Sequence, residues 1–138
     1  MNEKQLVLEA IAAREKAYTP YSGFSVGAAL LAKSGKIYCG CNIENATYTP
    51  SNCAERTAFF KAVSEGEREF EAIAIVGGKS GVPISEYCPP CGVCRQVMME
   101  FCSAESFRIL LAKSAEEWKS YSLETLLPLG FSRKNLET

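Results

Sequence analysis

The spacing of apolar residues predicts a helix followed by a pair of strands at the start of the chain. Apolar and small residues recur at helical intervals in the first segment: Leu6, Val7, Ala10, Ile11, Ala13 and Ala17. This pattern predicts a helix over residues 3–17. The turn-rich stretch 18–23 separates it from an apolar run at 24–31, which is typical of a buried strand. Ser34 and Gly35 then form a hairpin turn before a returning strand at 36–41.

The remaining elements alternate between helix and strand. They are a helix that begins near Cys53 and ends at 64–67, a strand at 70–76, a helix at 92–102, a strand at 107–111 and a short helix at 122–127. Gly77 and Gly78 are expected to close the strand before them, and 79–90 is expected to be a loop. Ser122 fits an N-cap. This order predicts a mixed α/β fold with helices on both faces of one sheet.

Composition narrows the class of protein. A length of 138 residues fits a single domain spanning 1–138, and the formal net charge of −1 gives no electrostatic reason to expect nucleic acid or a membrane as partner. No apolar run approaches the roughly 20 residues that a membrane-spanning helix needs. The first residues predict a helix rather than a signal peptide. We therefore expect a cytoplasmic protein.

The numbers of cysteines and histidines restrict the possible kinds of functional site most. The chain has seven cysteines and no histidine. An odd count in a chain of this size favours metal binding in a reducing compartment over a disulfide framework. Without histidine, Ser-His-Asp and Cys-His catalysis are excluded. Any zinc site must use thiolates or carboxylates.

Two short motifs supply such ligands. Cys53 stands two residues before Glu55, and a Pro-led Cys-x-x-Cys places Cys91 and Cys94 at the start of a predicted helix. Three protein ligands leave one position of a tetrahedral zinc open, as in catalytic sites. Water at such a zinc ionises near neutral pH, and Glu55 is free to move protons. Helix N-termini favour the thiolate form of the cysteines.

Other polar and cysteine positions leave alternatives open. Cys88 could be a fourth ligand in a closed structural site that binds a partner, although Pro89 and Pro90 have no N–H to offer its sulfur. Cys39, Cys41 and Cys102 are most simply buried small apolar residues. The polar segment 42–45 reads locally as a capped turn, since Asn favours turns.

Four ordered motifs give the chain a family resemblance. They are Pro20-Tyr21-Ser22-x-Phe24-x-Val26-Gly27-Ala28-Ala29, Asn42-Ile43-Glu44-Asn45-Ala46, Asn52-Cys53-Ala54-Glu55-Arg56-Thr57-Ala58 with Pro90-Cys91-x-x-Cys94-Arg95-Gln96, and Leu126-Leu127-Pro128 with Phe131. Together they resemble the small zinc-dependent cytidine deaminases over nearly the whole chain, and the Cys-Ala-Glu and Pro-Cys-x-x-Cys pair matches the zinc-deaminase signature. The loop before Pro90 looks longer than is usual in that family. The resemblance implies a three-layer α/β/α fold with about five strands.

The resemblance also implies roles for individual residues. Cys53, Cys91 and Cys94 resemble the ligands of one Zn²⁺ per subunit, Glu55 the proton shuttle, and Arg56 a residue that lies against the sulfurs. Four positions resemble nucleoside contacts: Phe24, Asn42, Glu44 and the backbone of Ala54. The resemblance also implies a homotetramer. Tyr48 and Phe131 match positions that reach into the active site of a neighbouring subunit.

The expected reaction is hydrolytic deamination of cytidine, and of 2′-deoxycytidine, to the uridine nucleoside and ammonia in pyrimidine salvage. The partner is then a free nucleoside, since the carboxylate of Glu44 accepts a hydroxyl but repels phosphate. A related aminopyrimidine nucleoside is the alternative substrate, although the 42–45 segment favours an ordinary ribose.

Overall fold

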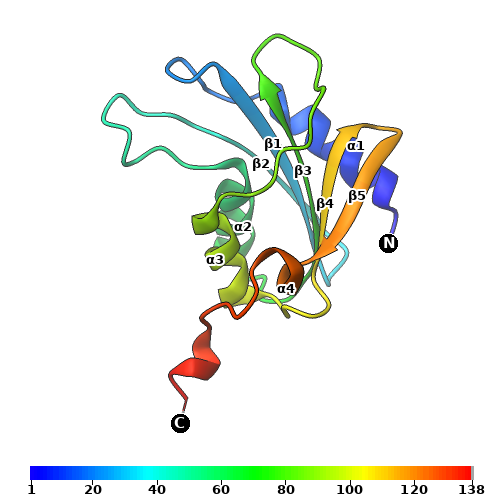
Figure 1. The fold of residues 1–138 in the computed structure, drawn as a ribbon, viewed down its shortest axis with the longest axis vertical. Helices are drawn as coiled ribbons and strands as arrows, with labels where there is room; N and C mark the ends of the chain where they lie inside the picture. The colour runs from blue at the N-terminus through cyan, green and yellow to red at the C-terminus, as the bar shows by residue number, and fades with distance from the viewer. Residues whose placement is uncertain (138) are drawn as a thin grey trace.

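The strands build one mixed sheet. The computed structural model describes residues 1–137, and the strand order in the sheet is β2-β1-β3-β4-β5 (Figure 1). The strands are β1 (Phe24–Ala32), β2 (Ile37–Cys41), β3 (Phe70–Lys79), β4 (Arg108–Ser114) and β5 (Glu117–Ser122). β3 and β4 run parallel, and the other neighbours are antiparallel. The prediction of one mixed sheet with about five strands is confirmed.

Helices cover both faces of this sheet (Figure 1). They are α1 (Glu3–Arg14), α2 (Ala54–Ser64), α3 (Gly92–Phe101) and α4 (Leu123–Leu126), with a 3₁₀ turn at Arg133–Asn135. One apolar core lies between α1 and the sheet, and a second lies under α2 and α3. The predicted three-layer α/β/α arrangement is therefore confirmed. None of the described helices is long and apolar enough to cross a membrane.

The glycine pair does not close β3, contrary to the sequence prediction. Gly77 and Gly78 stay in register with β1, and the strand continues to Lys79. The carbonyls of Gly78 and Lys79 accept hydrogen bonds of 3.0 and 2.7 Å from Nη2 of the buried Arg14. Gly77 is required for packing, because a Cβ there would lie 2.7 Å from Cys88 Sγ. These glycines therefore extend the strand.

Two further elements differ from the prediction, one in its end and one in its existence. The first helix ends at Arg14 rather than at 17, and the strand β5 was missed. β5 is a mostly polar edge strand without buried residues, so it lacks the alternation by which strands are recognised. Its Trp118 donates a 3.0 Å hydrogen bond from Nε1 to Glu3, which joins the edge of the sheet to α1.

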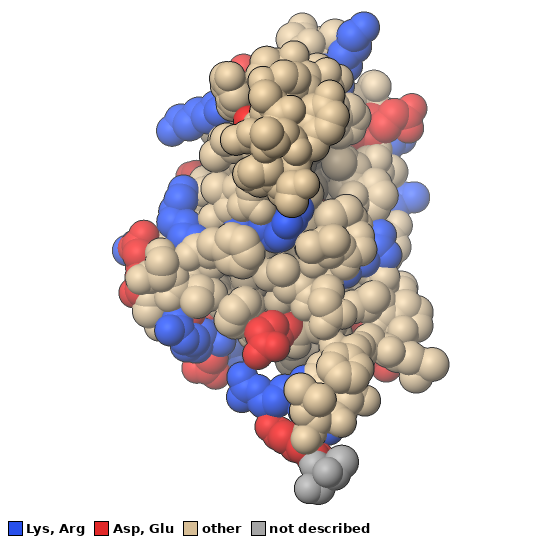
Figure 2. Space-filling model, turned by 90° about the vertical axis from the view of Figure 1, so that its left-hand side faces the viewer, with Lys and Arg blue, Asp and Glu red and all other residues tan. Residues whose placement is uncertain are grey.

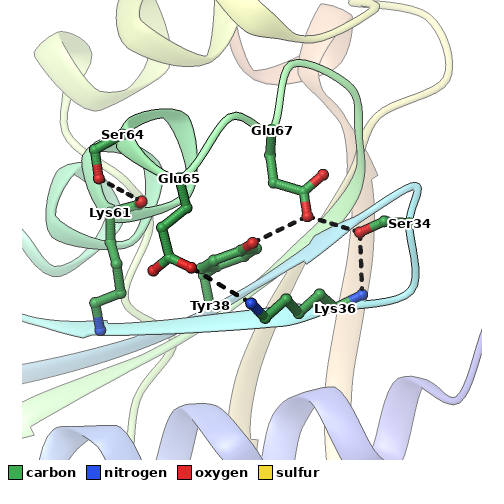
Figure 3. Close-up of polar contacts among 7 residues, drawn as sticks. All are labelled: Ser34, Lys36, Tyr38, Lys61, Ser64, Glu65 and Glu67. Carbon is green, nitrogen blue, oxygen red and sulfur yellow. Dashed lines mark hydrogen bonds and ion pairs between the residues drawn. The ribbon is translucent and has the colours of Figure 1, made fainter.

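Polar contacts tie the C-terminal end of α2 to the β1–β2 hairpin (Figure 3). Glu67 accepts hydrogen bonds from Ser34 at 2.7 Å and from Tyr38 at 3.0 Å. Lys36 and Glu65 form an ion pair of 3.4 Å beside them. Exposed pairs of this kind contribute little to stability, because water and salt screen them. They fix the orientation of α2 over the hairpin more than they stabilise the fold.

The N-terminal end of α2 is held against β2 by a close backbone approach at Gly40. A Cβ at Gly40 would lie 2.6 Å from the backbone nitrogen of Ala58 and still closer to the carbonyl oxygen of Ala54. A helix can rest on a strand at this separation only when the strand residue has no side chain. Gly40 therefore sets the height of the first turn of α2 above the sheet.

We expect Gly40→Ala to displace the start of α2. Overpacking of this kind typically costs about 1–3 kcal/mol, and the shift carries Cys53 with it. The free energy of unfolding, measured in urea, should fall by that amount, and bound zinc should decrease. Gly78→Ala is the matched control, because a Cβ at Gly78 meets its nearest atoms only at 3.7 and 3.9 Å and lies away from the metal ligands. Equal stability of the two variants would contradict the close-approach argument.

Candidate metal centre and active site

Three cysteines converge at the N-termini of two helices. Cys53 is the N-cap residue of α2, Cys91 is the N-cap residue of α3, and Cys94 lies in the first turn of α3. Their sulfur atoms all lie within 4.8 Å of one another. Sγ of Cys53 is 3.8 Å from Sγ of Cys91, which is 3.4 Å from Sγ of Cys94. The predicted helix starts at Cys53 and Cys91 are confirmed.

The donor set and its spacing fit one Zn²⁺ per chain. Thiolates at Zn–S distances of about 2.3 Å in a tetrahedron are about 3.8 Å apart, close to the spacings found here. Among residues 1–137, the group of cysteine and acidic side chains able to hold a metal consists of Cys53, Cys91 and Cys94. Cys88 is outside this group and packs against Gly77. Three ligands leave one tetrahedral position for a substrate or water.

Positive charge lies directly against the sulfurs. Nη2 of Arg56 donates to Cys53 Sγ at 3.1 Å, while the buried Nε of the same guanidinium has no hydrogen-bond partner among the described residues. Hydrogen bonds from the Cys94 thiol and from Arg56 lower the pKa of Cys53 to about 5. The pKa of Cys94 is raised because its thiol donates to Cys53. The thiolate form is therefore favoured at Cys53.

Glu55 is the acidic side chain beside this cluster. It lies in the first turn of α2 and is only 4% exposed. Burial raises the pKa of its carboxyl to about 7, and the negative charge of Cys53 adds to this effect. A carboxyl group with such a pKa can both accept and release a proton near neutral pH.

Asn42 and Glu44 are held in place by backbone contacts. The Asn42 amide accepts from Val26 N at 2.9 Å and donates to Phe24 O at 2.8 Å. The carboxylate of Glu44 accepts from the hydroxyl of Ser22 and from two backbone N–H groups, at Ser22 and at Tyr21, each at 3.0 Å. These bonds lower the pKa of Glu44 and keep it ionised. The local prediction of a capped turn is wrong: residues 42–45 are extended, with Ile43 bridged to Tyr18 and Asn52, and the segment presents a fixed carboxylate.

The structure brings some of the nucleoside-contact candidates together and leaves others apart. Glu44 and Tyr48 line one depression of about 320 Å³, in which the rings of Tyr48 and Tyr21 lie edge to face at 6.0 Å. Ala54, the first residue of α2, is fully buried. Phe131 is outside that depression, and its carbonyl accepts a 2.8 Å bond from Gln96 of α3. Phe24 and Phe131 remain largely exposed.

The segment before Cys91 is anchored by a residue that the sequence analysis did not single out. The ring of Tyr87 lies 4.7 Å from the ammonium of Lys113 and 5.0 Å from that of Lys119, and its hydroxyl donates to Glu117 at 3.3 Å. Those partners lie on β4 and β5, far away in the sequence. The loop is therefore fixed to the sheet four residues before the first ligand of the Cys-x-x-Cys motif.

Arg95 fixes the other side of this motif. Its Nε donates to Pro90 O at 2.8 Å, and its Nη1 donates to the carbonyl of Leu126. The Arg95 guanidinium thus donates to backbone carbonyls, one of which, Pro90 O, directly precedes Cys91. It holds α3 against the start of the C-terminal segment and keeps Cys91 and Cys94 in their places.

Comparison with known proteins agrees with this geometry. The sequence model of the cytidine and deoxycytidylate deaminase zinc-binding region matches residues 1–109. The chain is 51% identical over 136 residues to a cytidine deaminase of Sporosarcina psychrophila, covering 99% of this chain and 96% of that protein. Identity to the Halalkalibacterium halodurans cytidine deaminase is 48% over 136 residues, covering 99% and 98%.

Solved structures extend the agreement to the fold. The crystal structure of cytidine deaminase from Burkholderia pseudomallei is similar with a TM-score of 0.84 and 47% identity, covering 95% of this chain and all of that one. The cytidine deaminase of Mycobacterium tuberculosis is similar with a TM-score of 0.78 and 34% identity, over 95% and 98% of the two chains. The chain belongs to the cytidine and deoxycytidylate deaminase family.

Proposed function

We propose that the protein catalyses the zinc-dependent hydrolytic deamination of cytidine to uridine and ammonia. The observation that carries this proposal is the pairing of a three-thiolate centre, which leaves one zinc position open, with the buried carboxyl of Glu55 in the adjacent turn. A structural zinc site would use four ligands and would leave Glu55 without a task. The relatives at 51% and 48% identity are cytidine deaminases.

The chain's own residues supply binding and proton transfer. Zinc, when bound, acts as a Lewis acid that makes water nucleophilic at neutral pH. Glu55 accepts the proton of the attacking water and passes it to N3 of the pyrimidine as oxygen adds to C4. The same carboxyl then takes the remaining proton from the hydroxyl on C4 and passes it to the leaving amine, so that the C4 carbonyl forms as C–N cleavage releases ammonia. Proton transfer by a positioned group contributes typically about 10²–10⁴ in rate.

The nucleoside contacts determine the class of substrate. The backbone of Ala54 binds the pyrimidine edge, Phe24 packs near the base, and Asn42 with Glu44 binds the ribose hydroxyl. The ionised Glu44 repels a phosphate, which favours a free nucleoside over a nucleotide or a strand. We extend the proposal to 2′-deoxycytidine and to a role in pyrimidine salvage. Another aminopyrimidine nucleoside is the alternative substrate.

The proposal includes a homotetramer with shared active sites. Several large apolar side chains are exposed in the single chain: Tyr21, Phe24, Tyr48, Phe60, Leu129 and Phe131. Figure 2 looks onto the side of the molecule that carries the loop between β2 and α2, and much of that surface is uncharged. Tyr48 and Phe131 reach into sites of neighbouring subunits in this arrangement. Aromatic side chains such as these are enriched at protein interfaces.

A cytoplasmic location is also part of the proposal. All seven cysteines are free, including the half-buried Cys39 and Cys41 on β2. Free thiols and a thiolate metal centre persist best in a reducing compartment.

We expect Glu55→Gln to abolish turnover while zinc stays bound. The amide keeps the shape of the side chain but cannot carry a proton, so kcat for cytidine should fall by at least about 10²–10⁴. Turnover is followed by ultraviolet absorbance and ammonia release at matched zinc content. Glu71→Gln is the control, since Glu71 is exposed on β3. Retained activity in Glu55→Gln would refute the proton-transfer role.

We expect Arg56→Ala to weaken zinc retention or lower kcat. Zn²⁺ with three thiolates carries a net charge of −1, and Arg56 compensates it from 3.1 Å. Zinc release to a chromogenic chelator and kcat are measured beside Arg68→Ala. Arg68 donates to the carbonyls of Val63 and Glu67, near the opposite end of α2, and offers the same loss of charge. Unchanged zinc content and kcat in Arg56→Ala would show that Arg56 does not stabilise the zinc centre.

We expect light scattering of the zinc-loaded protein to give about four times the chain mass of 15.1 kDa. Shared sites also predict complementation: an inactive Glu55→Gln protein mixed and reassembled with a Tyr48→Ala protein should recover part of the activity. A monomeric mass would contradict the shared-site arrangement.

A further inference from the structure

A second groove lies along the free edge of the sheet, apart from the metal centre. It has a volume of about 410 Å³ and is bounded by α1, β2 and α2. Cys39 and Cys41, which the sequence predicts to be buried apolar residues, are only partly buried and line this groove. The groove shares no lining residue with the depression that contains Glu44 and Tyr48. The proposed deamination uses none of its side chains.

Backbone polar groups of β2 point into the open edge. The backbone N–H of Asn42 donates to Val26 O, so alternate residues of β2 face β1 and the residues between them face outward. Cys39 and Cys41 are outward-facing by this alternation, and Lys61 Nζ donates to the carbonyl of Cys39. Both N–H groups therefore face the open side of the edge strand, as donors toward the groove.

This free edge is too short to accept an added strand. The next outward-facing residue, Ile43, is already paired with Asn52 by two hydrogen bonds of 3.0 and 2.9 Å. Lys61 further covers the middle of the edge, and lysine on an edge strand opposes pairing with another chain. A small molecule is thus the occupant that the geometry admits.

The charged side chains of the groove indicate which kind of small molecule would bind there. Lys16 and Lys61 both line the groove, and neither forms an ion pair of 4.0 Å or less with a carboxylate of residues 1–137. Glu9, the carboxylate of the groove, lies 3.6 Å from Cys39 Sγ. The side-chain balance is therefore positive, and Ala12, Ala13 and Ile43 add apolar wall. Cations, N–H donors and apolar wall together match an anion with an apolar body.

We propose that this groove binds a small organic anion with an apolar body. Its acidic group lies between the ammonium groups of Lys16 and Lys61, and its apolar body lies on the alanines of α1. The groove is linked to the metal centre through its wall residue Thr57, whose hydroxyl donates to Cys53 O at 3.1 Å and accepts from Asn52 at 3.3 Å. The groove therefore adjoins the backbone of a zinc ligand, while the nucleoside stays outside the groove.

The test uses 8-anilinonaphthalene-1-sulfonate as probe on the intact, zinc-loaded protein. We expect one saturable site per chain by fluorescence titration, retained in saturating uridine. The double variant Lys16→Ala/Lys61→Ala should raise Kd at least fivefold. Lys33→Ala/Lys134→Ala is the matched control, which removes two exposed charges elsewhere. N-phenyl-1-naphthylamine, which has the same rings without the sulfonate, should bind at least tenfold more weakly.

A second variant fills the groove instead of changing its charge. Ala12 is exposed on α1 and lines the groove, so Ala12→Trp should abolish probe binding without lowering Tm. Displacement of the probe by uridine would place it in the nucleoside site and overturn the proposal. Equal affinity of the charged and uncharged probes, or a Kd unchanged in both groove variants, would overturn it as well. Cytidine turnover is measured in parallel, so a failure of the deaminase proposal is seen separately.

Discussion

The convergence of two helix N-termini on one point above the sheet is the constraint on which the rest of the site depends. α2 and α3 each begin at a cysteine, and their partial positive charges meet at the three sulfurs. Gly40 sets the height of one helix and the Tyr87 and Arg95 contacts fix the start of the other. The packing of α2 and α3 on the sheet thus determines where the three cysteine ligands lie.

Burial and charge act together in the first turn of α2. Cys53, Glu55 and Arg56 are consecutive or nearly so, yet their environments separate their behaviour. A thiolate that accepts two hydrogen bonds is stabilised, while a buried carboxyl without a cation of its own holds its proton more tightly. In the proposed reaction, one turn of helix therefore supplies a ligand, a proton carrier and a compensating charge.

Local signals in the sequence were enough for the helix starts, the metal ligands and most of the sheet. Cys53 and Cys91 were placed at helix starts because capping and apolar periodicity are properties of a few neighbouring residues. The signals failed where distant contacts decide: Arg14 keeps Gly78 in a strand, and β5 is a strand only because β4 offers an edge. The groove beside Cys39 could not be foreseen, because α1, β2 and α2 meet there only in the folded chain.

The zinc ligands join parts of the chain that the fold otherwise connects through the sheet. Cys53 and Cys91 are 38 residues apart, with the central strand β3 between them, and α3 lies on the crossover from β3 to the parallel β4. A metal bound to all three sulfurs is therefore a reversible cross-link that closes a long loop. Because the unfolded chain holds no such preformed site, metal binding adds to the free energy of folding that the two apolar cores supply. The measured affinity for the metal therefore also reports how fully α2 and α3 are brought together in the folded chain.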